Sequence, residues 1–225
     1  MPSIELKNIS LIFRGDIILK DISLNLLPHS ITSLFGSSGS GKTSLLRIAS
    51  TLLSPNHGEV VCQDEYIREK TRKEILSMRS KIFGFFFPEP IFLEELTVRE
   101  NILISFILSK QTIPQQYYEQ LLKTFEITQL ESFVVSRLSS GQRERVNFIR
   151  AIIHSPQILI LDEPWANLDD RMKKILFDYI YTLRDRMTIL IATHDSELKK
   201  YSDSSYSLYD STLHSLEDSR AQDPK

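Results

Sequence analysis

One glycine-rich segment limits the possible folds of this chain more than any other feature. The residues GSSGSGKT, 36–43, follow the apolar stretch ITSLF and open SLLRIASTLL, whose apolar residues have helical spacing. A strand that turns through such a loop into a helix directs backbone N–H groups and the positive end of the helix dipole at an anion. We expect this loop to bind phosphate groups through Gly36, Ser37, Ser38, Gly39, Ser40, Gly41, Lys42, Thr43 and Ser44.

Two side chains of the loop have the chemistry that a nucleoside triphosphate requires. Lys42 would bridge the β- and γ-phosphates, and the hydroxyl of Thr43 would ligate Mg²⁺. The alternative is a loop of small residues that only caps a helix, and composition alone produces such a match in roughly one chain in a hundred. The flanking strand and helix argue against that alternative.

A pair of carboxylates at the end of another apolar strand supplies groups that a nucleotide site still needs. In ILILDEP, Asp162 ends the strand, where it can orient the water shell of the metal, and Glu163 follows at the carboxyl edge. Glu163 is the candidate general base. Acidic residues after a strand also commonly cap the next helix, and this interpretation stays open for the pair taken alone.

The order of strand-like and helix-like segments predicts an α/β fold. Alternating segments at 4–13 and 17–26 indicate an antiparallel N-terminal sheet, and later, uniformly apolar strands alternate with helices. That alternation is typical of a parallel core sheet covered on both faces. A charged helix is predicted at 68–80, and TVRE at 97–100 is a predicted capping box. We expect one domain over 1–217, with a helical subdomain at about 86–140 and a polar tail at 218–225.

The composition argues against several partners and compartments. With 27 basic and 29 acidic residues the formal net charge is −2, which gives no basic field for nucleic acid. The single cysteine, Cys62, excludes an internal disulfide and is typical of a small apolar residue at a strand end. The apolar runs are far shorter than the roughly 20 residues that span a bilayer, and the first residues do not resemble a signal peptide, so we expect no direct membrane insertion.

Three further motifs complete an ordered series. LSSGQRERV occupies 138–146, ANLD occupies 166–169, and ATHD occupies 192–195. Together with the glycine-rich loop and the carboxylate strand, in this order, they make the chain resemble the ABC (ATP-binding cassette) ATPase family along nearly its whole length. The resemblance implies the ABC ATPase form of the P-loop NTPase fold, ATP hydrolysis, and the cofactors ATP and Mg²⁺.

The resemblance also implies roles for residues outside the loop and the carboxylate pair. His194 would hold the γ-phosphate and the attacking water, and Asp169 would join two subunits across their interface. Phe13 matches the aromatic residue that stacks on adenine, although a phenylalanine there is equally a core strand residue. The signature segment, 139–142, would contact the γ-phosphate of ATP held by the opposite subunit through Ser139, Ser140, Gly141 and Gln142.

A single cassette in the chain implies a second ATPase subunit, in the simplest case a homodimer, because half of each ATP site comes from the other chain. The resemblance further implies an integral membrane permease-type partner and a cytoplasmic, peripheral place on the inner face of a bacterial membrane. The segment 77–102, together with ANLD, is similar to a group that includes lipoprotein-releasing, macrolide-exporting and cell-division ATPases. That group performs mechanical work on a membrane partner.

Two other classes of function stay open. The main alternative is a soluble ABC-type ATPase that acts on nucleic acid or ribosomes, but repair and chromosome ATPases of the family carry long coiled-coil or zinc-bearing inserts. Here only about a hundred residues separate Lys42 from Leu138, and none has heptad spacing. A phosphotransferase kinase is the other class, and it would not need LSSGQ.

Three positions depart from the family pattern. Pro88, followed by Glu89, stands where the family usually has a glutamine that touches magnesium and relays the nucleotide state to the membrane partner. Ser140 replaces a usual glycine, which restricts any positive φ at that position. Trp165 replaces a small polar residue and is either partly exposed at the interface or simply packed.

Overall fold

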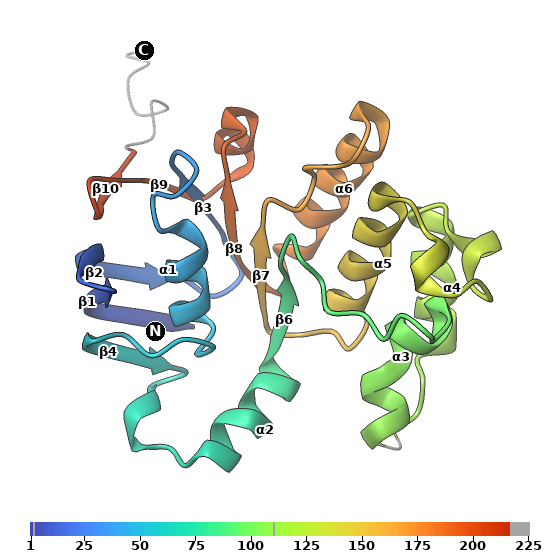
Figure 1. Cartoon of the computed structure of the whole chain (residues 1–225), viewed down its shortest axis with the longest axis horizontal. Helices are drawn as coiled ribbons and strands as arrows, with labels where there is room; N and C mark the ends of the chain where they lie inside the picture. Colours follow the sequence, from blue (N-terminus) through green and yellow to red (C-terminus); the bar gives the residue numbers. More distant parts are fainter. Residues whose placement is uncertain (2, 110, 217–225) are drawn as a thin grey trace.

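The computed structural model describes residues 1, 3–109 and 111–216, so the polar tail predicted at 218–225 lies outside the described residues. Two β-sheets and the helices around them build the molecule (Figure 1). The first sheet is antiparallel, in the order β2-β1-β4-β5, as expected for the N-terminal part. Its strands are β1 (Ile4–Phe13), β2 (Asp16–Leu26), β4 (His57–Cys62) and β5 (Glu65–Tyr66).

The second sheet has the order β10-β9-β3-β8-β7-β6, and its neighbours pair in parallel except for β10 with β9. All residues of β7 and β8 are buried, because helices or the other sheet cover both faces of these central strands. The predicted fold class, α/β with a parallel core sheet, is confirmed. The strands are β3 (Ile31–Phe35), β6 (Phe83–Phe86), β7 (Ile158–Asp162), β8 (Thr188–Thr193), β9 (Ser204–Tyr209) and β10 (Thr212–Ser215).

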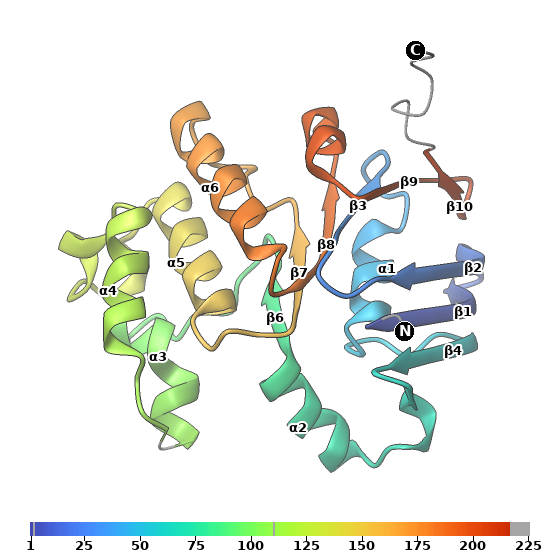
Figure 2. The same cartoon turned by 180° about the vertical axis from the view of Figure 1, so that it is seen from behind.

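Alternate residues of β7 enter two separate apolar cores. Leu159 and Leu161 belong to the core under the helices α5 and α6. Ile158 and Ile160 belong to the core that the sheet shares with α1 and the antiparallel sheet. Figure 2 shows this division from behind, with α1 on one side of β7 and β8 and the other two helices on the opposite side. The three helices are α1 (Lys42–Ala49), α5 (Ser140–Ile152) and α6 (Asp170–Leu183).

Capping boxes set the first residues of two further helices. The predicted box before α3 is confirmed, because the N–H of Thr97 donates to Glu100 at 2.8 Å and the N–H of Glu100 donates to Oγ1 of Thr97 at 3.2 Å. The charged helix α2 begins later than predicted, since Thr71 and Glu74 form another capping box. The remaining helices are α2 (Arg72–Ile82), α3 (Val98–Ser109) and α4 (Gln115–Thr124).

Two expectations from composition can be compared with the structure. Cys62 is 1% exposed at the end of β4, and burial raises the pKa of its thiol to about 11, so it is a packed strand residue as predicted. Among the described helices, none combines the length and the apolarity that crossing a bilayer requires.

A substitution at Gly84 tests how closely the sheet packs on α5. A Cβ added to Gly84 of β6 would lie 2.1 Å from the carbonyl oxygen of Ala151 and 2.8 Å from the ring of Pro156. We expect Gly84→Ala to lower the free energy of unfolding by about 3 kcal/mol, because such overpacking forces the backbone to shift. Urea denaturation measures the change. The control is Gly15→Asn in an exposed turn, where a Cβ meets nothing within 4 Å and only the backbone strain of a side chain at φ 94° remains, about 1 kcal/mol; equal midpoints for the two variants would contradict the packing argument.

Candidate active site

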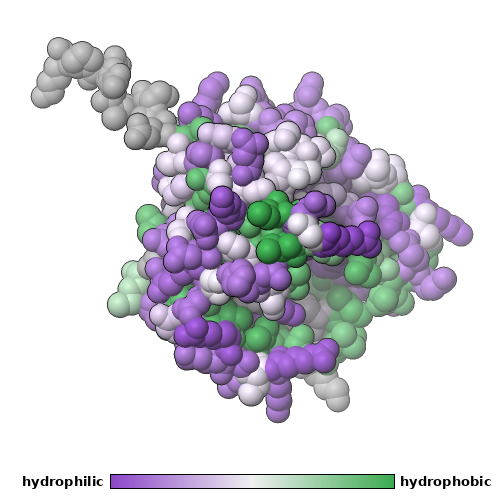
Figure 3. All heavy atoms as spheres, turned by 60° about the vertical axis from the view of Figure 1, so that its left-hand side comes forward, coloured by the Kyte–Doolittle hydropathy of each residue, from purple (hydrophilic) through white to green (hydrophobic). Residues whose placement is uncertain are grey.

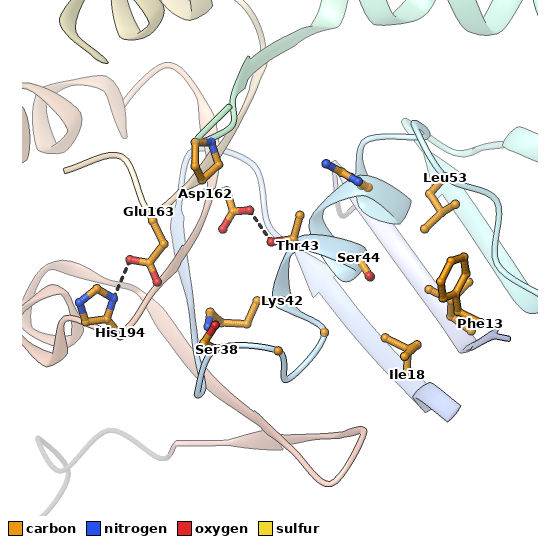
Figure 4. Close-up of a pocket in the computed structure, with 15 residues that line it drawn as sticks. Phe13, Ile18, Ser38, Lys42, Thr43, Ser44, Leu53, Asp162, Glu163 and His194 are labelled. Carbon is orange, nitrogen blue, oxygen red and sulfur yellow. Dashed lines mark hydrogen bonds and ion pairs between the residues drawn. The ribbon is translucent and has the colours of Figure 1, made fainter. Parts of the chain in front are cut away.

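A pocket of about 810 Å³ lies where the glycine-rich loop meets the carboxyl ends of β7 and β8 (Figure 4). Its two ends differ in chemistry. Apolar side chains of the antiparallel sheet and of the segment after α1 form one end: Leu11, Phe13, Ile18 and Leu53. The other end is polar and contains Ser38, Gly39, Gly41, Lys42, Thr43, Ser44, Arg47, Asp162, Glu163 and His194, with Pro88 beside them.

The loop has the backbone form that close contact with an anion requires. Gly39 has φ 80° and Gly41 has φ 103°, a region that residues with a side chain rarely adopt. Gly41 precedes α1 and has no side chain to accept from the first N–H groups of the helix, which stay available to an anion. Nζ of Lys42 donates to the carbonyl oxygens of Gly36 at 2.7 Å and Ser37 at 3.0 Å, so the ammonium group is held against the loop.

Thr43 and Asp162 come together from α1 and β7. Oγ1 of Thr43 donates to Oδ2 of Asp162 at 2.5 Å, as the dashed line in Figure 4 marks. Asp162 is 3% exposed, and this burial raises the pKa of its carboxyl group, while the hydrogen bond from Thr43 opposes the rise. A hydroxyl and a carboxylate oxygen are ligands that suit Mg²⁺, which also keeps water and phosphate oxygens in its shell. The described residues contain no cluster of three His, Cys, Asp or Glu that could hold a metal without such help.

Glu163 and His194 form a second contact at the polar end. Nδ1 of His194 lies 2.9 Å from Oε2 of Glu163, and Oγ1 of Thr193 donates to the same oxygen at 3.2 Å. The backbone of Glu163 has φ 47°, and its N–H donates to the carbonyl oxygen of Ala192 at 2.9 Å. A left-handed residue with a side chain costs about 1–2 kcal/mol, so the neighbouring strand holds this carboxylate in a strained position.

Phe13 lies at the apolar end of the pocket. Its side chain is 60% exposed, so the alternative that it is a core strand residue is wrong. Ile12 and Ile17 on the same pair of strands are also exposed. Figure 3, which brings the left-hand side of Figure 1 forward, shows hydrophobic atoms in green near the centre of that face, with hydrophilic atoms in purple around them. An exposed aromatic ring at the mouth of a pocket offers a face on which a planar base can stack.

The signature segment and Asp169 do not line this pocket. Ser139 caps α5 by accepting from the N–H of Gln142 at 3.3 Å, and Asp169 caps α6 by accepting from the N–H of Met172 at 2.8 Å. Ser140 is the first residue of α5 and has helical geometry. The restriction on positive φ that serine was expected to impose therefore has no effect at this position.

The departures from the family pattern lie beside the pocket. Pro88 lines it, whereas Glu89 is exposed and does not. Trp165 is 4% exposed and stacks on Phe177 of α6 with ring centroids 4.3 Å apart, which decides for the packed alternative. Sequence reasoning missed Arg47, whose guanidinium lies 5.6 Å from the centroid of the Phe87 ring and lines the pocket. Its place one helical turn after Thr43 was the available signal.

Comparison with known proteins gives a consistent result. A profile of the ABC transporter family matches residues 19–166. The lipoprotein-releasing system ATP-binding protein LolD of Desulfotalea psychrophila is 34% identical over 87% of this chain and 89% of its own length. The ABC transporter ATP-binding protein YxdL of Bacillus subtilis is 33% identical over 88% of this chain and 80% of its own length.

A solved structure agrees with the sequence relatives. The dimeric structure of the ABC transporter cassette MJ0796 superposes with a TM-score of 0.87 and 26% identity, over 96% of this chain and 99% of that one. A second structure of MJ0796, a dimer in a post-hydrolysis state with ADP and Pi, has the same TM-score at 25% identity. The alternative of an ATPase acting on nucleic acid is not favoured by these relatives. The chain belongs to the ABC transporter family, as an ATP-binding cassette subunit that hydrolyses ATP with Mg²⁺ as the usual ion.

Proposed function

We propose that two copies of this chain bind two ATP molecules between them and perform mechanical work on a membrane permease. One observation carries the dimer: the pocket contains the loop, the carboxylate pair and His194, whereas the signature segment and Asp169 of the same chain lie outside it. A second copy, placed head to tail, would supply its signature segment to the γ-phosphate at the open side of the pocket. Asp169 would then lie at the interface.

Different residues of the pocket would contact the base, the phosphates and the Mg²⁺ of the bound nucleotide. Phe13 stacks on the base, and the N–H groups of residues 36–44 surround the phosphates. Lys42 leaves the carbonyl oxygens of the loop and turns to the β- and γ-phosphates. Thr43 and Asp162 would hold Mg²⁺, directly and through water respectively, in place of their mutual hydrogen bond. When bound, Mg²⁺ neutralises charge on the phosphate oxygens.

Glu163 and His194 serve hydrolysis. Water attacks the γ-phosphorus, the bond between that phosphorus and the bridging oxygen of ADP breaks, and Glu163 accepts a proton of the attacking water. His194, which lies 2.9 Å from Glu163, contacts the γ-phosphate and orients the water. The fixed backbone of Glu163 supports this role, because a general base acts only within hydrogen-bond reach of the proton that it takes.

The membrane partner binds the surface of residues 87–108 under this proposal. Large apolar side chains are exposed there, with Ile91 87% and Leu108 77% accessible. Exposed apolar side chains mark sites of protein interaction where they gather into one patch, and this is what we propose for the surface of residues 87–108. The relatives named LolD belong to lipoprotein-releasing systems, so release of a lipoprotein is the substrate class that we favour. The chain would act as one domain over 1–217, with its helical subdomain at about 86–140 as the partner-binding part, at the cytoplasmic face of the membrane.

The first test separates the general base from the phosphate ligand. Glu163→Gln should reduce turnover by roughly 10² to 10⁴ while ATP affinity is retained, since the amide cannot accept the proton. Lys42→Ala should instead lose ATP binding. Nucleotide affinity and steady-state turnover are measured for both variants. Parent-like turnover in Glu163→Gln would overturn the assignment of the base.

A second test addresses the head-to-tail dimer. Ser139→Arg and Lys42→Ala each remove one half of every site in a homodimer, so each variant alone should be inactive. In a mixed dimer, one site keeps Lys42 from one chain and Ser139 from the other. With random assortment we expect the mixture to recover up to about a quarter of parental ATPase activity. Full activity in dilute, isolated monomer would contradict this arrangement.

The third test concerns the position where the family usually has glutamine. Proline has no N–H and a fixed φ, and its side chain contains no oxygen or nitrogen beyond the backbone, so the side chain of Pro88 can neither ligate magnesium nor position water. Glu89 is exposed and does not line the pocket, and a further carboxylate near the γ-phosphate would be repelled by it. We expect Glu89→Ala to leave the Mg²⁺-dependent ATPase activity of the isolated dimer nearly unchanged. Pro88→Gln should instead change how strongly the membrane partner stimulates ATPase activity. A large fall in Mg²⁺ affinity on Glu89→Ala would show that this carboxylate replaces the glutamine.

A further inference from the structure

A buried carboxylate joins α5 to the loop that follows Glu163. Glu144 lies on α5 and is 5% exposed. It accepts from Asn167 in three places: the N–H of Asn167 lies 3.2 Å from Oε1 and 3.1 Å from Oε2, and Nδ2 of Asn167 lies 2.6 Å from Oε1. We call these contacts the Glu144–Asn167 tether.

The tether is not part of an ion pair with the neighbouring arginines. Arg143 donates to Glu94, and Arg145 donates to the carbonyl oxygens of Gly141 and Phe125. Burial raises the pKa of Glu144, and only the hydrogen bonds from Asn167 oppose this rise. Burial removes the hydration of the Glu144 carboxylate, which costs free energy, and one side-chain amide and one backbone N–H return only part of that free energy. Stability alone therefore does not account for the contact.

The two segments that the tether joins serve different ATP molecules under the proposed function. The N-terminal end of α5 carries the signature segment, which faces the ATP of the partner. The loop 163–169 begins at the general base, and hydrogen bonds from Ala166 to Glu163 at 3.3 Å and from Leu168 to Trp165 at 3.2 Å make it compact. The loop also passes close to the signature segment, because a Cβ on Gly141 would lie 2.9 Å from the carbonyl oxygen of Asn167.

We propose that Glu144 is a positioning residue: by holding Asn167, it makes the signature segment and the loop of the general base move as one body. Arrival of ATP on the partner then engages the signature segment at the start of α5 and, through the tether, sets Glu163 against the ATP of its own chain. The tether is thus a route by which each site senses occupancy of the other. This inference rests on the proposed dimer and on the proposed role of Glu163.

Turnover as a function of ATP concentration tests the inference in the full chain. The parent dimer should show a Hill coefficient between 1 and 2. We expect Glu144→Ala to bring the coefficient to 1 and to reduce kcat on the order of tenfold, because the base is misplaced. The ATP affinity of dilute monomer should stay at the parental value, since Glu144 does not line the pocket. Glu144→Gln should restore both quantities, because its amide oxygen still accepts from Asn167.

A matched control removes another carboxylate near the same helices. Glu126 accepts from Arg171 of α6 and does not contact Asn167. Glu126→Ala should therefore keep the parental Hill coefficient and kcat. Loss of cooperativity in this control, or failure of Glu144→Gln to restore it, would overturn the inference, because either result would indicate a general effect of packing or charge.

Asn167→Ala covers the case in which Glu144→Ala does not fold. This variant removes only the Nδ2 donor and keeps the backbone N–H, and it should lower the Hill coefficient in the same direction. A parental coefficient in Asn167→Ala or in folded Glu144→Ala overturns the tether alone, provided that the parent is cooperative. A parent that hydrolyses ATP without cooperativity also overturns the tether, whereas the proposed dimer fails only if the mixture of Ser139→Arg and Lys42→Ala recovers no activity, so the two failures are distinguishable.

Discussion

Burial of both faces of β7 and β8 is the constraint on which the rest of the structure depends. Alternate residues of β7 enter two cores. The same sheet therefore packs against α1 on one face and against α5 and α6 on the other. Polar side chains are tolerated only where these strands leave the sheet. Asp162 at the last position of β7, Glu163 just after it and His194 just after β8 therefore meet at one edge, beside the loop that follows β3.

The charged groups at that edge shift the pKa of Asp162 in opposite directions. The pKa of Asp162 is raised by burial and by the nearby charge of Glu163, and it is lowered by the hydroxyl of Thr43 and by the cations Lys42 and Arg47. Each of these groups is held by the protein itself: Lys42 by loop carbonyl oxygens, Glu163 by His194 and Thr193. Binding of ATP under the proposed function therefore exchanges the partners of Lys42 and Thr43, whereas the contacts of Glu163 with His194 and Thr193 lie outside that exchange.

Most of the fold could be predicted from the sequence, as could the meeting of the glycine-rich loop with the carboxylate pair at one pocket. Local sequence determines three of these features: the glycine-rich loop, the carboxylate strand and the capping box at Thr97. Their residue types and spacing are therefore enough to predict them. Other features depend on contacts between distant segments. The exposure of Phe13 depends on its place at the end of β1 in the antiparallel sheet. The packing of Trp165 depends on its contact with Phe177. Arg47 and Glu144 gain their importance from Phe87 and Asn167, far along the chain, and no local pattern indicates such pairs.

The packing of Trp165 also gives the chain an optical signal. It is the only tryptophan in the sequence, and it lies two residues after Glu163. Its indole is stacked on Phe177, and within the described residues its Nε1 has no hydrogen-bond partner. An indole in such dry surroundings emits at shorter wavelength than one in water. Intrinsic fluorescence of the unmodified protein therefore reports, without any attached dye, on whether Trp165 stays packed against Phe177 of α6.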